Sequence, residues 1–75
     1  LSMTPFKKYI RRQIAELRPF KAGEVLSDKV SISAFDLENG SPKPGDMIAR
    51  NPKDHSDQWL ISKEYFEENF DLFKE

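Results

Sequence analysis

The sequence contains no cysteine, few glycines and no long apolar run. Without thiols, no disulfide can stabilise so short a chain and no thiolate can act as a nucleophile or metal ligand. The glycines, Gly23, Gly40 and Gly45, are too widely spaced to form a phosphate-cradling loop. No apolar stretch approaches the ~20 residues that span a membrane, and none resembles a signal peptide. These absences exclude thiol chemistry and a phosphate-binding loop, and they predict that the chain does not enter a membrane.

Histidine is almost as scarce, because His55 is the single one. It lies between Asp54 and Ser56 in a polar stretch and lacks the ligand set that a zinc site requires. No Ser–His–acid arrangement is indicated by the spacing. We therefore predict no metal, no cofactor and no catalytic residue, and we expect that the protein is not an enzyme. An enzyme or metal protein centred on His55 is a minor alternative to a solvated loop tip.

A chain of 75 residues forms one domain at most. Its aromatic content of 12% argues against disorder, because aromatic side chains supply a large buried area per residue. We predict a single α+β domain over residues 3–75. Leu1 and Ser2, which precede Met3, are interpreted as the remnant of an expression tag.

The charge is unevenly distributed, although the net charge is only −1. Residues 1–22 carry +5 and residues 23–75 carry −6. One interpretation is internal, with a basic first segment docked against the acidic end of the same chain. The other is a basic surface that binds nucleic acid or an acidic protein.

The first segment has the pattern of a helix. Thr4 is a good N-cap, and Pro5 suits the first helical position because its φ angle is already fixed. Apolar residues then recur at helical spacing up to Leu17, and Arg18-Pro19 ends the pattern. The candidate binding residues are the cations of this segment, namely Lys7, Lys8, Arg11, Arg12 and Arg18.

The middle of the chain has the pattern of short strands. Alternation predicts a strand at Val30–Ser33, and apolar runs predict two more at Met47–Arg50 and Gln58–Ile61, with a polar loop over Lys53–Asp57. Between the first two strands, Ser33 resembles an N-cap, and Asn39-Gly40 favours the end of a helical turn over a hairpin.

The last segment predicts a helix from its cap at Ser62 to about Phe73. The fold expected overall is a short antiparallel three-stranded sheet packed against N- and C-terminal helices. Trp59 is assigned to the core, with a partner-facing role as the alternative. The complete predicted core is Phe6, Ile10, Ile14, Leu17, Val30, Ile32, Ile48, Trp59, Ile61, Phe66, Phe70 and Phe73.

The stretch Gly45–Pro52 (GDMIARNP) is followed by DQWL at 57–60, by Tyr65-Phe66 and by Asn69-Phe70. This pattern resembles a family of small, uncharacterised proteins of tailed bacteriophages and prophages. The likeness extends to residues 12–19, 31–33 and 39–43 and so covers most of the chain. It implies a phage-encoded protein in the cytoplasm of a bacterial host, and it implies no activity.

Together these observations predict a small non-enzymatic binding module that acts on a host or phage protein. The alternative is an accessory protein that binds nucleic acid through the basic first segment. Neither the partner nor the oligomeric state follows from the sequence.

Overall fold

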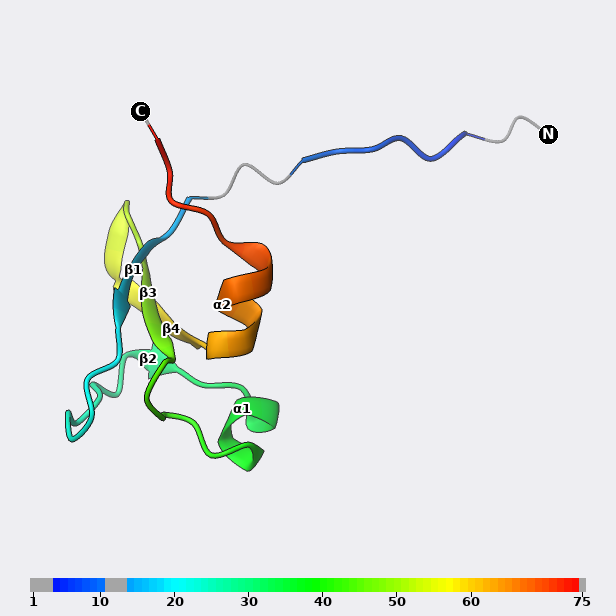
Figure 1. The fold of residues 1–75 in the computed structure, drawn as a ribbon. Helices are drawn as coiled ribbons and strands as arrows, with labels where there is room; N and C mark the ends of the chain where they lie inside the picture. Colours follow the sequence, from blue (N-terminus) through cyan, green and yellow to red (C-terminus); the bar gives the residue numbers. More distant parts are fainter. Residues whose placement is uncertain (1–3, 11–13, 75) are drawn as a thin grey trace.

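The computed structural model describes residues 4–10 and 14–74, in which four strands form one mixed sheet and two short helices join it (Figure 1). This confirms the predicted α+β class, and no helix in the described part is long and apolar enough to cross a membrane. The interpretation of Leu1-Ser2 as a tag remnant concerns residues outside this description. In chain order the elements are β1 (Glu16–Pro19), β2 (Val30–Ser31), α1 (Ala34–Glu38), β3 (Met47–Asn51), β4 (Asp54–Ile61) and α2 (Lys63–Asn69).

The strand order is β1-β3-β4-β2, with β1 and β2 at the two edges. β3 pairs antiparallel with both β1 and β4, whereas β2 runs parallel to β4. The predicted three-stranded antiparallel sheet is therefore wrong in strand number and in the direction of the β2 pairing. Because the chain passes through α1 and β3 between β2 and β4, no tight turn imposes an antiparallel arrangement on this pair.

The predicted N-terminal helix is not formed in the described residues. Residues 4–10 have no regular secondary structure, and Glu16–Pro19 forms the edge strand β1. Leu17 lies opposite Ala49 of β3, so pairing with a distant strand overrides the local helical pattern. Like charges at i, i+4 spacing, such as Lys7 with Arg11, also disfavour an isolated helix, whose nucleation is costly.

The polar loop predicted over Lys53–Asp57 is wrong as well, since β4 begins at Asp54. Asn51 Oδ1 accepts a hydrogen bond from the Lys53 backbone N–H at 2.9 Å, which closes a tight turn between β3 and β4. The strand register shifts between Arg50 and Asn51. The polar residues thus form only the hairpin turn and the start of β4. Because polar residues are common in loops, the polar composition of this stretch did not indicate that a strand begins in it.

Both helix starts are confirmed. The Ser33 hydroxyl accepts from the Asp36 backbone N–H at α1, and the Ser62 hydroxyl accepts from the Tyr65 N–H at α2. The predicted end of α1 is also confirmed, because Gly40 has a φ of 91° just after the C-cap. α2 ends at Asn69, one turn earlier than predicted.

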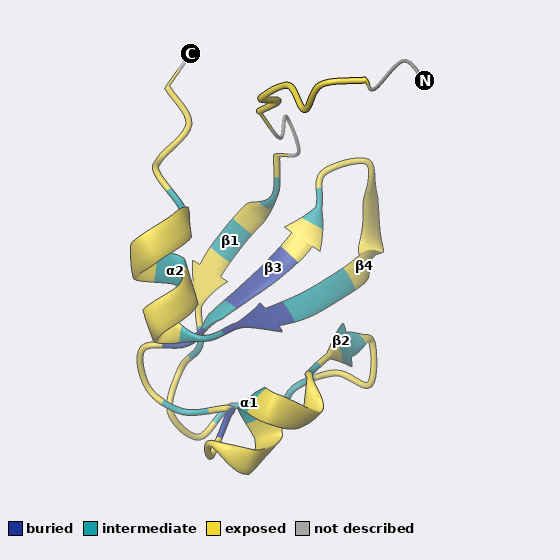
Figure 2. Ribbon diagram, turned by 90° about the vertical axis from the view of Figure 1, so that its right-hand side faces the viewer, coloured by how far each residue is buried: buried dark blue, intermediate teal, exposed yellow. Residues whose placement is uncertain are grey.

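The core is smaller than predicted and lies at the middle of β3 and the end of β4 (Figure 2). Its buried apolar residues are Ile48, Ala49, Leu60 and Ile61, of which Ala49 and Leu60 were not expected. Trp59 is only half-buried. Of the remaining predicted members, Leu17, Val30, Ile32, Phe66 and Phe70 are half-buried, and Phe6, Ile10, Ile14 and Phe73 are exposed.

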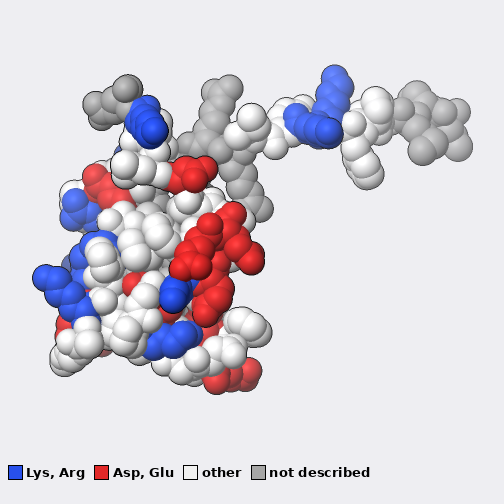
Figure 3. Space-filling model, viewed as in Figure 1, with Lys and Arg blue, Asp and Glu red and all other residues white. Residues whose placement is uncertain are grey.

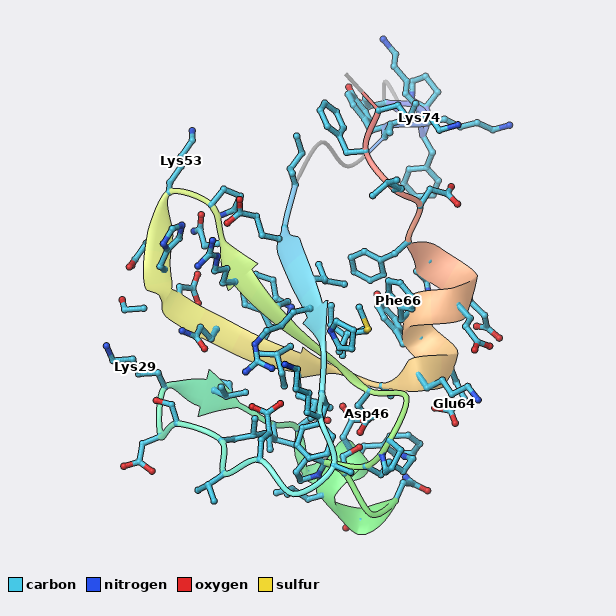
Figure 4. All side chains as sticks on the ribbon, turned by 60° about the vertical axis from the view of Figure 1, so that its left-hand side comes forward. Lys29, Asp46, Lys53, Glu64, Phe66 and Lys74 are labelled. Carbon is cyan, nitrogen blue, oxygen red and sulfur yellow. The ribbon has the colours of Figure 1, made fainter. Side chains whose placement is uncertain are left out.

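Asp46 is a fully buried carboxylate at the start of β3, near the first turn of α2 (Figure 4). Its Oδ2 accepts hydrogen bonds from the Ser41 hydroxyl at 2.7 Å and from the Lys43 N–H at 3.0 Å. Its Oδ1 accepts from the Lys63 N–H, the first residue of α2, at 3.1 Å. The preceding Gly45 has a φ of 96°, and a Cβ there would lie 2.8 Å from Lys63 Cδ. Glycine therefore lets the turn approach α2 closely enough for Asp46 to bind it.

The ionisation of Asp46 is governed by two opposing effects. Burial disfavours its charged form, while the hydrogen bonds from Ser41, Lys43 and Lys63 favour it; together with the Lys43 charge they hold the pKa of Asp46 below its ordinary value. Because the folded-state pKa is lowered, ionised Asp46 stabilises the fold above the ordinary Asp pKa of about 3.9. This stabilisation is lost as the pH falls through the lower pKa of the folded state.

We expect Asp46→Asn to lower the free energy of unfolding by about 1–3 kcal/mol at neutral pH, because the amide N–H₂ would face a buried donor. Urea unfolding of parent and variant measures this difference, and the exposed Asp28→Asn is the matched control. The difference should begin to shrink below about pH 4, where the unfolded parent binds a proton at this carboxylate, and should be lost once the pH falls below the lowered pKa of the folded state. A difference that stays constant through that range would contradict the role given to the Asp46 charge.

Candidate protein-binding surface

Residues 4–10, named here the N-terminal arm, leave the sheet as an extended segment that runs away from the fold (Figure 1). All seven residues are exposed, and the large apolar ones are almost wholly in water. Phe6 is 105% exposed, Ile10 90% and Tyr9 87%. Lys7 and Lys8 lie between them. The arm therefore presents apolar side chains and positive charge together.

A groove lies where the arm joins the fold, between β1 on one side and α2 with residues 71–74 on the other. It has a volume of about 990 Å³ and is named here the α2 groove. Phe66 points from α2 towards the sheet (Figure 4), and its ring stacks on that of Phe70 with centroids 6.0 Å apart. The other apolar residues that line it are Ile14, Ala15, Leu17, Met47, Leu72 and Phe73.

The two sides of this region carry opposite charge. Figure 3 shows Asp and Glu side chains gathered over α2, and Lys side chains on the arm, away from the fold. The acidic residues in and just after α2 are Glu64, Glu67, Glu68 and Asp71, all exposed. The α2 groove itself is mainly apolar, and its charged lining residues are Glu16, Asp71 and Lys74.

The structure describes three of the five cations predicted as binding residues, and these three do not form one cluster. Lys7 and Lys8 are neighbours on the exposed arm, while Arg11 and Arg12 lie outside the described residues. Arg18 lies in β1 and already has a partner within the chain. No common basic helical face unites these residues in the described part of the chain.

Arg18 forms a two-point ion pair with Glu24. Its Nη1 and Nη2 atoms donate to the two carboxylate oxygens at 2.8 and 3.0 Å, and the Lys21 N–H donates to the same carboxylate at 2.9 Å. The Arg18 hydrogen bond is the largest of the effects that lower the pKa of Glu24 to about 2. Arg18 therefore closes the turn after β1, and its charge is largely neutralised there.

The opposite face of the sheet holds a smaller hollow of about 350 Å³, bordered by β1, β3 and β4. Arg50 Nε donates to Glu16 Oε1 at 2.7 Å, and His55 Nε2 lies 3.5 Å from the same oxygen. His55 is thus an exposed residue of β4 rather than a loop tip. Within the described ranges no three His, Cys, Asp or Glu side chains lie close enough to hold a metal ion together. The charges of this face largely pair with one another.

Sequence reasoning identified the arm cations but missed the groove. Of the residues that line it, Leu17, Phe66 and Phe70 were assigned to a closed core, and Met47 was predicted only as a strand residue. Leu72 and Phe73 lie beyond the end of α2 and are exposed. Two adjacent large apolar residues near the end of the chain were the available sequence signal that the core is incomplete. Only the spacing of α2 from β1 shows that a groove remains between them.

Comparison of the chain with family models, with curated proteins and with solved structures finds no match. The resemblance to small proteins of tailed bacteriophages consequently stays a prediction. The arrangement of the arm and the groove is the basis on which function is argued.

The Arg18–Glu24 pair yields a direct measurement. We expect Arg18→Gln to raise the pKa of Glu24 from about 2 towards its ordinary value, because the charged donor is lost. Carboxyl chemical shifts followed by NMR during an acid titration report this pKa. Arg50→Gln, which leaves Glu24 untouched, is the matched control. A Glu24 pKa that does not move in Arg18→Gln would show that the pair does not persist in solution.

Proposed function

We propose that this chain is a small non-enzymatic protein-binding module that acts on a host or phage protein through the N-terminal arm. The observation that carries the proposal is the exposure of Phe6, Tyr9 and Ile10 on one short segment. Transfer of such a side chain from water to an apolar contact contributes roughly 1.5–3 kcal/mol. Three of them on an arm that the fold leaves in water form an anchor for another macromolecule.

The charges of the arm indicate what kind of protein it binds. Lys7 and Lys8 are two adjacent, exposed cations of the arm. Cations at the rim of a contact speed association with an acidic surface and contribute specificity. The proposed partner is therefore an acidic protein with an apolar site. The phage origin and the bacterial cytoplasm implied by the resemblance belong to this proposal.

Recovery of partners from bacterial lysate tests the proposal. The tagged parent should retain a specific protein after nuclease treatment, and Phe6→Ser/Ile10→Ser should lose it without a change in melting temperature. Lys7→Glu/Lys8→Glu should lower the amount of partner recovered, and the remaining recovery should depend less on salt concentration. Lys29→Glu/Lys53→Glu, at two exposed lysines just before β2 and in the β3–β4 turn (Figure 4), is the matched charge control. Equal recovery by the parent and the arm variants would refute the role of the arm.

Nucleic acid is the second candidate partner, and Tyr9 is the residue that favours it. An exposed aromatic ring next to Lys8 on an extended backbone can stack on a base while the lysine contacts a phosphate. We expect such binding to fall steeply with salt, because each phosphate contact releases counterions. Fluorescence anisotropy with duplex and single-stranded probes at low salt measures it, with Tyr9→Ala as the stacking variant. No change in anisotropy with either probe would eliminate this candidate.

A further inference from the structure

We propose that the α2 groove of one molecule binds the N-terminal arm of a second copy of this chain, and that the exchange is reciprocal. The inference rests on the proposed function in one respect, that the arm is a protein-binding element, and it names one partner of that arm. It assigns an occupant to the groove, which the proposed function leaves open.

The arm and the groove are chemically complementary in their apolar parts. The open side of the groove exposes Leu72 by 87% and Phe73 by 64%, next to the stacked rings of Phe66 and Phe70. The arm offers Phe6 and Ile10, which are almost wholly exposed. Contact between the two sets would remove apolar surface of both from water, which drives association.

Their charges are complementary as well. Lys7 and Lys8 lie between Phe6 and Tyr9 of the arm, and the groove is lined by two carboxylates, Glu16 and Asp71, and by one cation, Lys74. An arm seated with Phe6 and Ile10 in the groove would bring its lysines near Glu16 and Asp71. Complementary charge of this kind fixes the orientation of a docked segment more than it adds to affinity.

Docking also explains the unused helical pattern of the arm. Phe6 and Ile10 are four residues apart, which places them on one side of a helix, and Thr4-Pro5 is a good helix start. A segment this short does not hold a helix alone, because nucleation is costly and most helical stability comes from packing an apolar face. An apolar groove provides that packing, as in other complexes in which an amphipathic helix binds a groove.

The course of the arm favours a second molecule over its own. It leads away from its own groove, so that the molecule is 57 Å long with a radius of gyration of 15.6 Å, against about 11 Å for a compact chain of this size. Ile14, just after the arm, lines the molecule's own groove. Each molecule thus presents both an arm and a groove, and two of them can exchange arms about a two-fold axis, which closes the assembly.

Size-exclusion chromatography with light scattering, run over a wide range of protein concentration, tests the inference. The parent should move with concentration from 8.8 kDa to twice that mass. The arm variant Phe6→Ser/Ile10→Ser and the groove variant Leu72→Ser/Phe73→Ser should each associate about tenfold more weakly or worse. Val25→Ser, which alters a 94% exposed residue outside both surfaces, should behave as the parent. All the altered side chains are exposed, so the fold should be retained, as circular dichroism can verify.

Mixing the two variants separates arm exchange from other modes of self-association. The arm variant keeps its groove and the groove variant keeps its arm, so the mixture retains one arm–groove contact that neither variant has alone. Because the chain has no cysteine, Lys53→Cys at the exposed hairpin turn permits specific dye labelling of each variant. Energy transfer should appear in the mixture at concentrations where each variant alone gives none.

Three results would overturn the inference. These are a parent that stays monomeric at every concentration, a dimer that persists unchanged in both variants, and a mixture that gives no energy transfer. In the first case, destabilisation of the monomer by either variant would indicate docking of the arm on its own groove. Recovery of a lysate partner that depends on Phe6 and Ile10 would still support the proposed function, so the two proposals fail separately.

Discussion

The buried carboxylate of Asp46 is the contact on which the arrangement of sheet and helix depends. Its side chain binds the first N–H of α2 through Lys63, and its backbone carbonyl accepts from Phe20 N–H, just after β1, at 2.9 Å. β1 and α2 form the two walls of the α2 groove. Both walls are thus hydrogen-bonded to Asp46. These hydrogen bonds, rather than side-chain packing across the groove, set the distance between β1 and α2.

This arrangement relates the small size of the core to the exposed apolar residues. A chain of this length has little apolar surface to bury, and four apolar residues of β3 and β4 are buried in the described part. A hydrogen-bonded anchor positions α2 without requiring that α2 be packed flat on the sheet. Of the aromatic residues of α2, Phe66 therefore remains half-buried and Tyr65 exposed. Apolar side chains that folding leaves partly exposed in this way are typical of an interaction site.

The sequence predicted local structure well and distant pairing poorly. The caps Ser33 and Ser62 and the helix end at Gly40 depend on neighbouring residues, and the structure confirms all three. Leu17 fitted a helical stripe equally well, yet it forms part of β1 because Ala49, far along the chain, lies opposite it. The role of Asp46 was not predicted, because aspartate is seldom fully buried and one of its three donors, Lys63, lies 17 residues further along the chain.

The candidate site was predicted in part for the same reason. Composition alone indicated that Lys7 and Lys8 belong to a basic segment, and they lie on the exposed arm. Arg18 belonged to the same basic run, but its ion pair with Glu24 depends on the turn that follows β1. The groove depends on the placement of Phe66 against Met47, which no local pattern records.

The edge position of β1 has a consequence for how the molecule opens. Its first residue, Glu16, pairs with Arg50, 34 residues further on, whereas β3 and β4 are joined by a tight turn. Closing the longer loop costs more chain entropy, so we expect the β3–β4 hairpin to form before β1 joins it. By the same reasoning, the free energy needed to detach β1 is lower than that needed to open the hairpin. The amide protons of β1 therefore exchange with solvent sooner. The arm is covalently continuous with β1, so each detachment releases a longer tether whose reach exceeds that of the arm alone.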